Sequence, residues 1–595
     1  MRLQLNFVNL LIRYKRHIGA QVDRITGSWL QEFSEERQLT REPQSDQFEA
    51  FSAYCVISSE FDGEFDPVEV RTGGGNDLAV DAAALVVNGD IITDSEEIED
   101  LRSRNNYLHA RILIVQAKTT SGFDGARITD LADNLCDFFS TNPTLPMSDE
   151  LKQFKELIER LYANSTAFRK GSPDLVVRYV TTGTWSGDTH LTSKVAAAKA
   201  RLEALNIFES VSFECLGAKE IQALYRGAKN TVEAEFLFPN QVLLPVIEGV
   251  EQSYIGTVEA SEYMKLISDA NGNIRKSLFY ENVRDFQDYN DVNRGIRDTL
   301  QEEHLRGRFV VLNNGVTVVA REMNVVRDKF TLRDYQIVNG CQTSHVLFDE
   351  KDQLEGVHVP LRLIVTQDED VASSVTAATN KQTLVSDEDL KALEVLQKEL
   401  EAFFEAHPIE KRLYYERRSK QHSSVPGLEK TRIITRPQLV RSYAAMMLDE
   451  PWRAGRYYKE LQRIRGDEIF APGDSPDPYY VSAVAAYRLE YFFRNGYVDG
   501  RFKPARYQIL MGIRHYAEPG EIPSKRRDLE KYCVRLADRL WDPQEGPKLV
   551  QAVLPVVDSA VEATEKDRIL DRDTVRTQNF TDLILKGVES LPRRK

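Results

Sequence analysis

Apolar residues follow two spacings over the first 230 positions, and each spacing predicts one type of element. Strands that alternate with helices predict an α/β layer of about 180 residues, counted with the helix before the first strand. Helices are predicted at 5–14, 25–33, 46–57, 126–139 and 218–228. Short apolar runs predict buried strands at 82–87, 112–118, 175–183 and 210–217.

The pattern changes near residue 231, where short apolar runs are separated by turn residues. These runs predict strands at 236–249, 308–320, 334–340 and 359–367. Beyond residue 385 the spacing is mostly helical. We therefore expect four parts: a helical segment at 1–45, an α/β domain at 46–230, a second, mixed α/β domain at 231–395 and a helical region at 396–595.

Composition excludes several classes of protein. No apolar run approaches the ~18 to 20 residues that a membrane span needs, and the first 20 residues lack the pattern of a secretory signal. We therefore expect a cytoplasmic protein without a membrane partner. The five cysteines lie far apart, with no CxxC pair, so neither disulfides nor a structural zinc site is expected.

Charge limits how this chain could bind nucleic acid. Asp and Glu number 92 against 77 Lys and Arg, which gives a net charge of −15. The molecule as a whole therefore repels phosphates, and any nucleic-acid binding must use local basic patches.

Polar residues stand at the ends of two predicted strands in a pattern that suits phosphodiester cleavage. The glycines at 73–75 permit a tight turn before Asp81, which opens the strand at 82–87, while Gln116 and Lys118 end the strand at 112–118. Alternate residues of a strand point to one face, so Gln116 and Lys118 would project together. A carboxylate can hold Mg²⁺, and a lysine can orient or deprotonate water and offset charge on phosphorus. The pattern favours a nuclease; alternatively, Asp81 and Lys118 are ordinary charged residues that bracket strands.

These residues resemble the PD-(D/E)XK restriction-endonuclease-like superfamily, in the variant where Gln replaces the second acid. Over about residues 46–230 the resemblance implies that Asp81 is the main ligand of Mg²⁺ (or Mn²⁺) and Lys118 the catalytic lysine. It implies that Gln116 binds the metal through its side-chain oxygen. It also implies a Glu from the preceding helix, for which Glu49 fits best and Glu60 is the alternative. Because Gln is neutral, the site would depend on Asp81 and Glu49 for charge.

Four segments in the second half resemble, in the expected order, the AIPR family, named for abortive-infection phage resistance. The resemblance covers about residues 240–550 and implies antiphage defence. The segments are ENVRDF at 281–286, LNNGVTVVA at 312–320, YQIVNGCQTSHVLF at 335–348 and ATNKQTLVSDEDL at 378–390.

These segments are rich in amide side chains, which both donate and accept hydrogen bonds, and Gly315 and Gly340 permit close approach by a ligand or another chain segment. The part QIVNGCQTS also resembles the DGQHR-type modules of DNA-modification-linked defence proteins, which implies a nucleotide or nucleic-acid sensor. The alternative is that these residues only build turns and strand ends. The predicted ligand or sensor residues are Asn313, Asn314, Asn339, Gln342, Asn380 and Gln382.

A basic segment stands out in this acidic chain. From Lys411 to Arg441 there are nine Lys and Arg against two Glu. Arginines bind phosphates and tyrosines can stack on bases, so this segment is the candidate nucleic-acid surface; a solvated helix face is the alternative. The predicted contact residues are Lys411, Arg412, Tyr415, Arg417, Arg418 and Lys420.

Together these features predict a two-part antiphage defence protein. The N-terminal domain, of restriction-endonuclease-like α/β fold, would cleave DNA in preference to RNA with Mg²⁺ (or Mn²⁺). The AIPR part would bind a trigger or position the substrate. A phage-derived trigger, a partner protein of the defence system and a homo-oligomer stay open. The alternative is a non-catalytic nucleic-acid- or nucleotide-binding regulatory protein with a degenerate nuclease fold, in which Gln116 marks the loss of activity.

Overall fold

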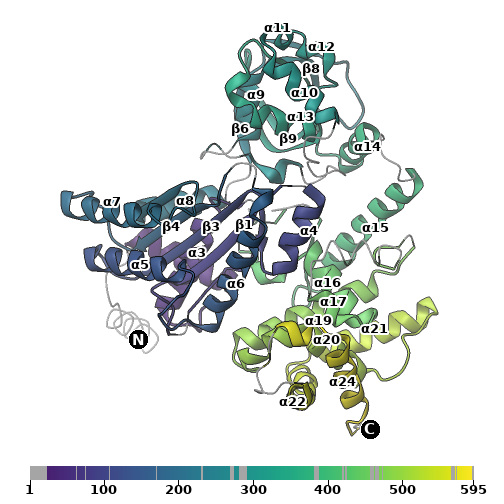
Figure 1. Cartoon of the computed structure of the whole chain (residues 1–595). Helices are drawn as coiled ribbons and strands as arrows, with labels where there is room; N and C mark the ends of the chain where they lie inside the picture. The colour runs from purple at the N-terminus through teal and green to yellow at the C-terminus, as the bar shows by residue number, and fades with distance from the viewer. Residues whose placement is uncertain are drawn as a thin grey trace, which may run out of the picture. The chain divides into compact units, whose positions relative to one another are not determined.

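The chain divides into two compact units, Met1–Asn230 and Thr231–Lys595, which are described separately (Figure 1). The structure is a computed structural model. It describes residues 23–592 except 62, 64, 74, 106, 169–170, 230–231, 269–271, 273, 280–290, 381–386, 418–420, 423–424, 426, 456–460, 462–464, 466–467, 472, 565–569 and 571.

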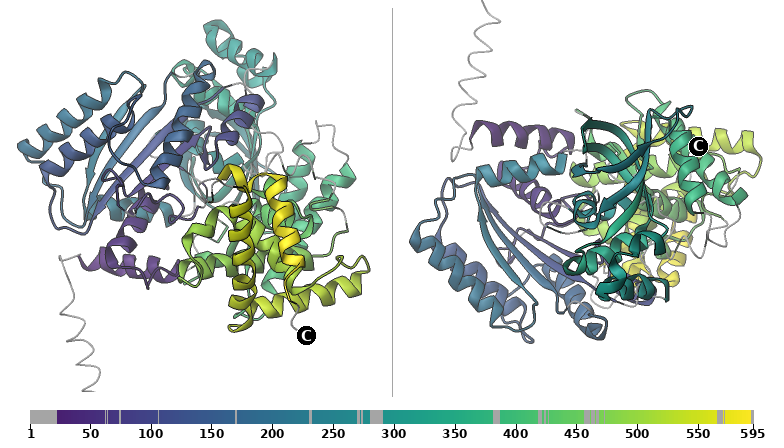
Figure 2. Two further views of the ribbon diagram at one scale, coloured as in Figure 1. Left: turned by 60° about the horizontal axis from the view of Figure 1, so that its bottom comes forward. Right: turned by 90° about the horizontal axis from the view of Figure 1, so that it is seen from above.

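Unit 1 contains a five-stranded mixed sheet (Figures 1 and 2). The strand order is β2-β1-β3-β4-β5. Strand β1 is antiparallel to both β2 and β3, whereas β3, β4 and β5 run parallel to one another. The strands are β1 (Ala82–Val87), β2 (Asp90–Ile92), β3 (Ala110–Lys118), β4 (Asp174–Thr181) and β5 (Val211–Leu216).

Helices cover both faces of this sheet, because each strand buries alternate side chains in two separate cores. In β3, Ile112 and Ile114 enter the core beneath α4, α5, α6 and α7, whereas Leu113 and Val115 enter the core beneath α2, α3 and α8. The helices are α2 (Arg24–Glu36), α3 (Gln44–Ile57), α4 (Ser95–Asn105), α5 (Gly125–Phe138), α6 (Asp149–Ala163), α7 (Thr189–Glu203) and α8 (Ala218–Lys229).

The sequence pattern located most of these elements. The four predicted strands of unit 1 and the helices predicted at 25–33, 46–57, 126–139 and 218–228 are confirmed, and the helix predicted at 5–14 lies outside the described residues. The structure adds β2, α4, α6 and α7. Strand β2 follows a two-residue turn in which Asn88 and Gly89 both have positive φ, as a hairpin turn requires.

Unit 2 begins with a six-stranded mixed sheet in the order β6-β10-β9-β11-β8-β7. Neighbouring strands are antiparallel except β9 and β11, which are parallel. The strands are β6 (Glu233–Leu237), β7 (Asn240–Leu243), β8 (Gln252–Glu259), β9 (Val316–Val326), β10 (Lys329–Asn339) and β11 (His358–Val365). The helices between them are α9 (Ala260–Ile267), α10 (Asp291–Gln301), α11 (Glu303–Arg306), α12 (Phe309–Leu312) and α13 (Cys341–Asp349).

Two predictions in this region are wrong in part. The stretch predicted at 236–249 holds the end of β6 and the whole of β7, and residues 244–249 form no strand. The strand predicted at 308–320 begins only at Val316, and Phe309–Leu312 forms the helical turn α12. Gly315, at φ +80°, separates the two. A run of four apolar residues fits either a strand or a helical turn, so spacing alone did not distinguish them.

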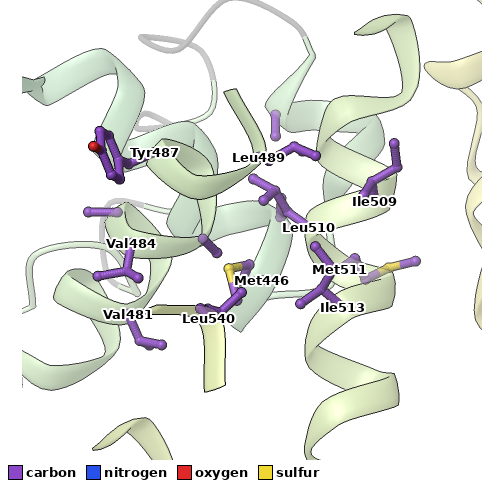
Figure 3. Close-up of a cluster of buried hydrophobic side chains, with 14 of the residues drawn as sticks. Met446, Val481, Val484, Tyr487, Leu489, Ile509, Leu510, Met511, Ile513 and Leu540 are labelled. Carbon is purple, nitrogen blue, oxygen red and sulfur yellow. The ribbon is translucent and has the colours of Figure 1, made fainter. Parts of the chain in front are cut away.

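The remainder of unit 2 is mostly helical, as predicted. Its helices from residue 387 onward share one large apolar core, part of which is shown in Figure 3 around Met446, Val484 and Leu510. The helix Glu369–Asn380 packs instead against the six-stranded sheet. In the part of the chain that the structure describes, no helix has the length and apolar character needed to cross a bilayer. The helices are α14 (Glu369–Asn380), α15 (Asp387–Glu405), α16 (Arg436–Met447), α17 (Pro451–Ala454), α19 (Asp477–Arg494), α20 (Arg506–Ala517), α21 (Arg526–Trp541), α22 (Glu545–Thr564), α23 (Arg572–Val575) and α24 (Gln578–Glu589); a two-stranded parallel sheet joins β12 (Tyr414–Glu416) to β13 (Ile433–Thr435).

Candidate metal centre

The loop before Asp81 holds an unusual backbone conformation. Three non-glycine residues, Asn76, Leu78 and Ala79, have φ values between +53° and +62°. Such conformations cost on the order of 1 to 3 kcal/mol each and persist only where neighbouring contacts hold them. Two contacts do so here: the backbone N–H of Ser148 donates to the Asn76 carbonyl at 2.9 Å, and Asn134 Nδ2 donates to the Leu78 carbonyl at 2.9 Å. Helices α5 and α6 thus hold the chain that delivers Asp81.

Asp81 lies immediately before β1 and is almost fully buried. Its backbone N–H donates to the carbonyl of Val115 at 2.9 Å, which extends the pairing with β3 by one residue. Its Oδ2 accepts from the backbone N–H of Ala117 at 2.7 Å, and Lys118 Nζ lies 3.1 Å from both carboxylate oxygens. Burial raises the pKa of Asp81 above its ordinary value, and Lys118 and the Ala117 N–H partly offset this rise. The predicted acid and lysine therefore meet directly.

Glu49 reaches the same place from α3. This helix packs Phe48 and Phe51 into the core and leaves Glu49 partly exposed. Burial, followed by the nearby charge of Asp81, raises the pKa of Glu49 to about 7. Arg71 lies 3.5 Å from its carboxylate and opposes the rise. The structure therefore brings a second carboxylate to Asp81.

Glu60, the alternative to Glu49, lies elsewhere. Its carboxylate accepts from Arg111 at 2.7 Å, and Arg111 is near the beginning of β3 whereas Lys118 ends that strand. The seven residue steps from Arg111 to Lys118 span about 20 Å or more in an extended strand. Glu60 is therefore excluded from the site, and Glu49 is the acid that fits.

Gln116 lies directly opposite Asp81 where β3 pairs with the chain that enters β1. The pairing of Ala82 with Val115 places Gln116 opposite Asp81, and its side chain is only 1 % exposed. The buried Oε1 of Gln116 has no hydrogen-bond partner within the described part of the chain. An orphaned buried acceptor costs free energy unless a donor or a cation satisfies it.

These residues fit a hard divalent cation. Glu49, Asp81 and Gln116 would hold it through two carboxylates and one amide oxygen. Across the ranges that the structure describes, no group of three or more His, Cys, Asp or Glu side chains could hold a metal ion. A site with two carboxylates suits Mg²⁺, which commonly takes one or two carboxylates and completes its coordination with water and substrate phosphate.

Arg71 was not singled out by the sequence. Its guanidinium lies 2.8 Å from Glu42, 3.5 Å from Asp46 and 3.5 Å from Glu49. It therefore pairs with two carboxylates of α3 and with one that lies just before this helix, beside the candidate centre. A single arginine far from its partners in sequence gives no periodic or motif signal, so only the fold reveals this role.

The raised pKa of Glu49 predicts a pH-dependent stability effect. Since the folded-state pKa of about 7 lies above the ordinary 4.5, ionising Glu49 disfavours the folded protein increasingly from pH 4.5 to 7. Without divalent metal, Glu49→Gln is therefore expected to stabilise unit 1 above pH 7 by on the order of 1 to 3 kcal/mol, and to have little effect near pH 4.5. Calorimetric unfolding of the full chain in EDTA at both pH values measures this. An equal effect of the substitution at both pH values would contradict it.

The predicted sensor amides of unit 2 bind other parts of the chain. Asn313 Oδ1 accepts from the backbone N–H of Gly315 at 3.0 Å and from Thr343 Oγ1 at 3.2 Å. Asn339 Nδ2 donates to the carbonyl of Thr379 at 2.6 Å. These two side chains therefore stabilise a turn and a helix end, which supports the alternative interpretation of the segment.

The remaining amides differ in their surroundings. Gln342 Oε1 accepts from Asn293 Nδ2 at 2.6 Å, whereas Asn314 is exposed. The side chain of Asn380 and the whole of Gln382 lie outside the described residues.

The two glycines of this cluster serve the fold. Gly315 and Gly340 have φ values of +80° and +105°. A Cβ on Gly315 would lie 2.5 Å from the Pro360 carbonyl oxygen, and one on Gly340 would lie 2.7 Å from a Val316 methyl. The sequence predicted that these glycines permit close approach of either a ligand or another chain segment. In the structure, both permit close approach of another chain segment.

The predicted nucleic-acid surface is wrong for two of its residues. Tyr415 is fully buried in β12 and its hydroxyl donates to Gln397. Arg417 is 10 % exposed and its Nε lies 3.1 Å from Glu401. The physical reason is that Tyr415 packs against Phe404 in the helical core and that Glu401 pairs with Arg417, which a count of charges cannot reveal.

The other members of this segment are engaged or lie outside the described residues. Lys411 Nζ pairs with Asp538 at 2.7 Å, and Arg412 Nε donates to the carbonyl of His407 at 3.0 Å. Arg418 and Lys420 lie outside the described residues.

The structure defines a protein with a layered α/β unit, which carries an acid, amide and lysine at one sheet edge, and a second unit with a mixed sheet and a helical region. A family model described as AIPR protein matches residues 279–586, entirely within unit 2. The chain belongs to the AIPR family, which confirms the family prediction. No curated protein and no solved structure matches this chain.

Proposed function

We propose that this AIPR protein acts in antiphage defence as a divalent-metal-dependent nuclease whose active site is the candidate metal centre at Asp81. The single observation that supports the proposal best is the convergence of Asp81, Glu49 and the orphaned Oε1 of Gln116 beside Lys118. A buried and a half-buried carboxylate with raised pKa values beside an unsatisfied oxygen are costly for stability, which is typical of a site built for a ligand.

Each side chain has a definable task in phosphodiester hydrolysis. A bound Mg²⁺ would supply charge neutralisation at the phosphate and at the attacking and leaving oxygens. Lys118, held against Asp81, places a cationic group that can orient the attacking water and offset negative charge on the pentacoordinate phosphorus. Attack by water forms one P–O bond as the bond to the leaving oxygen breaks. The attacking water gives up a proton to solvent, and the leaving oxygen takes one from solvent.

The direct test is metal-dependent degradation of nucleic acid by the purified full-length chain. Plasmid, single-stranded DNA and RNA are incubated with Mg²⁺, Mn²⁺ or EDTA. We expect cleavage of at least one substrate with metal and none in EDTA. Intact substrates under every condition would favour the alternative, a non-catalytic binding protein with a degenerate nuclease fold.

Substitutions at Gln116 test its role as a ligand. Gln116→Glu is expected to tighten Mn²⁺ binding by about tenfold, because it adds a charged oxygen, whereas Gln116→Leu should weaken it by about tenfold. Titration calorimetry with Mn²⁺ measures both effects without requiring activity. Gln47→Leu, on α3 but bonded to the Glu42 carbonyl, is the matched control and should leave the affinity unchanged. Equal Mn²⁺ affinity in the wild type and the Gln116→Leu variant would exclude Gln116 as a ligand.

A further inference from the structure

Two aromatic side chains meet above the ends of the parallel strands of unit 1. Phe123 lies in the loop between β3 and α5, and Trp185 in the loop between β4 and α7. Their ring centroids are 5.0 Å apart with an edge-to-face geometry. Both residues are half-buried and pack at the margin of the core that lies beneath α4, α5, α6 and α7. Each therefore keeps part of its surface open to solvent.

This aromatic pair lies next to the candidate metal centre. The pairing of β3 with β4 sets Tyr179 beside Gln116 and Thr181 beside Lys118. The Phe123 ring packs edge-on against the Tyr179 ring at 5.5 Å. Gln116 and Tyr179 are separated by the distance between neighbouring strands, and the Tyr179 and Phe123 rings are in contact. Added together, these two distances place the Phe123 ring about 10 Å from Gln116.

The surroundings of the pair suit a polynucleotide. The indole N–H of Trp185 has no hydrogen-bond partner among the described residues, and Arg127 and Lys194 form no ion pair with any of them. Arg127 is exposed and lies close enough for its charge to act on Tyr179, while Lys194 flanks Gly125. Helices α5 and α7, which carry these cations, pack side by side (Figure 1).

Acidic residues lie among these cations, which constrains the mode of binding. The carboxylates of Asp124 and Asp188 cap the N-termini of α5 and α7 by accepting from backbone N–H groups. These capped helix ends therefore do not serve as phosphate sites. Arg127 and Lys194 form no ion pair among the described residues, and Lys194 donates to Thr129 Oγ1 at 3.4 Å. Two such cations beside acidic residues favour binding by ring stacking, supported by about two phosphate contacts.

We propose that Phe123 and Trp185 form a binding site for a nucleobase of an unpaired strand, in which the base stacks on the face of one ring and the other ring, set edge-to-face, supports it. Arg127 and Lys194 would lie on adjacent phosphates, so that the substrate is single-stranded nucleic acid. This inference rests on the proposed nuclease function and names its substrate class. A base inside a duplex already stacks on both sides and offers no face to these rings. An unpaired base offers one, and stacking tolerates any sequence.

The test is binding of labelled 12-nucleotide DNA and RNA strands, and of the matching duplexes, to the full-length chain in EDTA. Trp185→Ala is expected to weaken binding of single strands by about tenfold or more, whereas Trp185→Phe should keep it within about threefold. Duplex binding should not change. The logarithm of the binding constant for single strands should fall with the logarithm of salt concentration with a slope of about −1.4 for two phosphates.

Two controls separate stacking from loss of fold. Trp452→Ala removes a partly exposed tryptophan of unit 2 and should leave binding unchanged. Phe123→Leu keeps an apolar contact on Tyr179 but removes the ring, and should also weaken single-strand binding. Unchanged single-strand affinity in both the Trp185→Ala and Phe123→Leu variants, or an equal loss for duplexes, would overturn the proposal.

These experiments distinguish a failure of the single-strand proposal from a failure of the nuclease proposal. Binding in EDTA needs no cleavage, so selective weakening by Trp185→Ala in a chain that cleaves nothing would contradict the proposed function alone. Cleavage of duplexes at the same rate by the wild type and Trp185→Ala would contradict the substrate class and leave the metal centre in place.

Discussion

Asp81→Asn is expected to reduce metal-dependent cleavage of nucleic acid by about 10²- to 10³-fold while the fold is retained. Asparagine keeps the shape of the side chain and an oxygen that can accept from the Ala117 N–H, but it removes the charge that pairs with Lys118 and would hold the cation. Cleavage rates with saturating Mg²⁺ measure the effect, and unfolding of the variant checks that it remains folded.

A pair of matched substitutions locates this effect at one end of the sheet. Glu49→Gln removes the second carboxylate of the candidate centre, whereas Glu60→Gln removes a carboxylate that pairs with Arg111 near the other end of β3. We expect a large loss of cleavage for Glu49→Gln and nearly wild-type cleavage for Glu60→Gln. A folded Asp81→Asn variant that cleaves at the wild-type rate would show that the chemistry occurs elsewhere.

Arg417→Glu is expected to destabilise unit 2 by about 2 to 4 kcal/mol and to leave the nucleic-acid affinity of the folded protein unchanged. The substitution replaces a partly buried ion pair with two carboxylates at Glu401, and breaking a buried pair leaves an uncompensated charge. Chemical unfolding of the full chain measures the loss, and binding measured against salt concentration checks the affinity.

Lys411→Glu provides the matched control for the same basic segment. The Lys411–Asp538 pair is exposed on both sides, at 41 % and 59 %, so its reversal should cost less than about 1 kcal/mol. If Arg417→Glu lowered the free energy of unfolding as little as Lys411→Glu does and also flattened the salt dependence of binding, this would show that the guanidinium of Arg417 contacts a phosphate.

The sequence by itself determined the elements that depend on residues close together in the chain. Apolar runs located β1 and β3, since a strand buried on both faces must be apolar along its length. The two-residue repeat of a strand then placed Gln116 and Lys118 together at the end of β3. The Asn88-Gly89 pair before β2 carried a hairpin signal of the same local kind, so the second strand could have been predicted as well.

Family membership was also determined by sequence, because the matching segments of unit 2 are contiguous stretches of chain that need no fold to be compared. Their amide side chains show the limit of that information. Asn313 and Asn339 bond to Thr343 and to the Thr379 carbonyl, which are 30 and 40 positions away. Whether an amide binds a ligand or its own chain depends on such distant partners.

Only the tertiary structure decided which side chains meet across long stretches of sequence. Glu49 and Glu60 both belong to the region around α3, yet the packing of Phe48 and Phe51 sends one acid to Asp81, while Arg111 holds the other near the far end of β3. Tyr415 likewise belongs to a basic segment but is buried. The physical reason is that strand and helix spacing act over a few residues, whereas burial and the pKa of Glu49 depend on neighbours that only packing brings together.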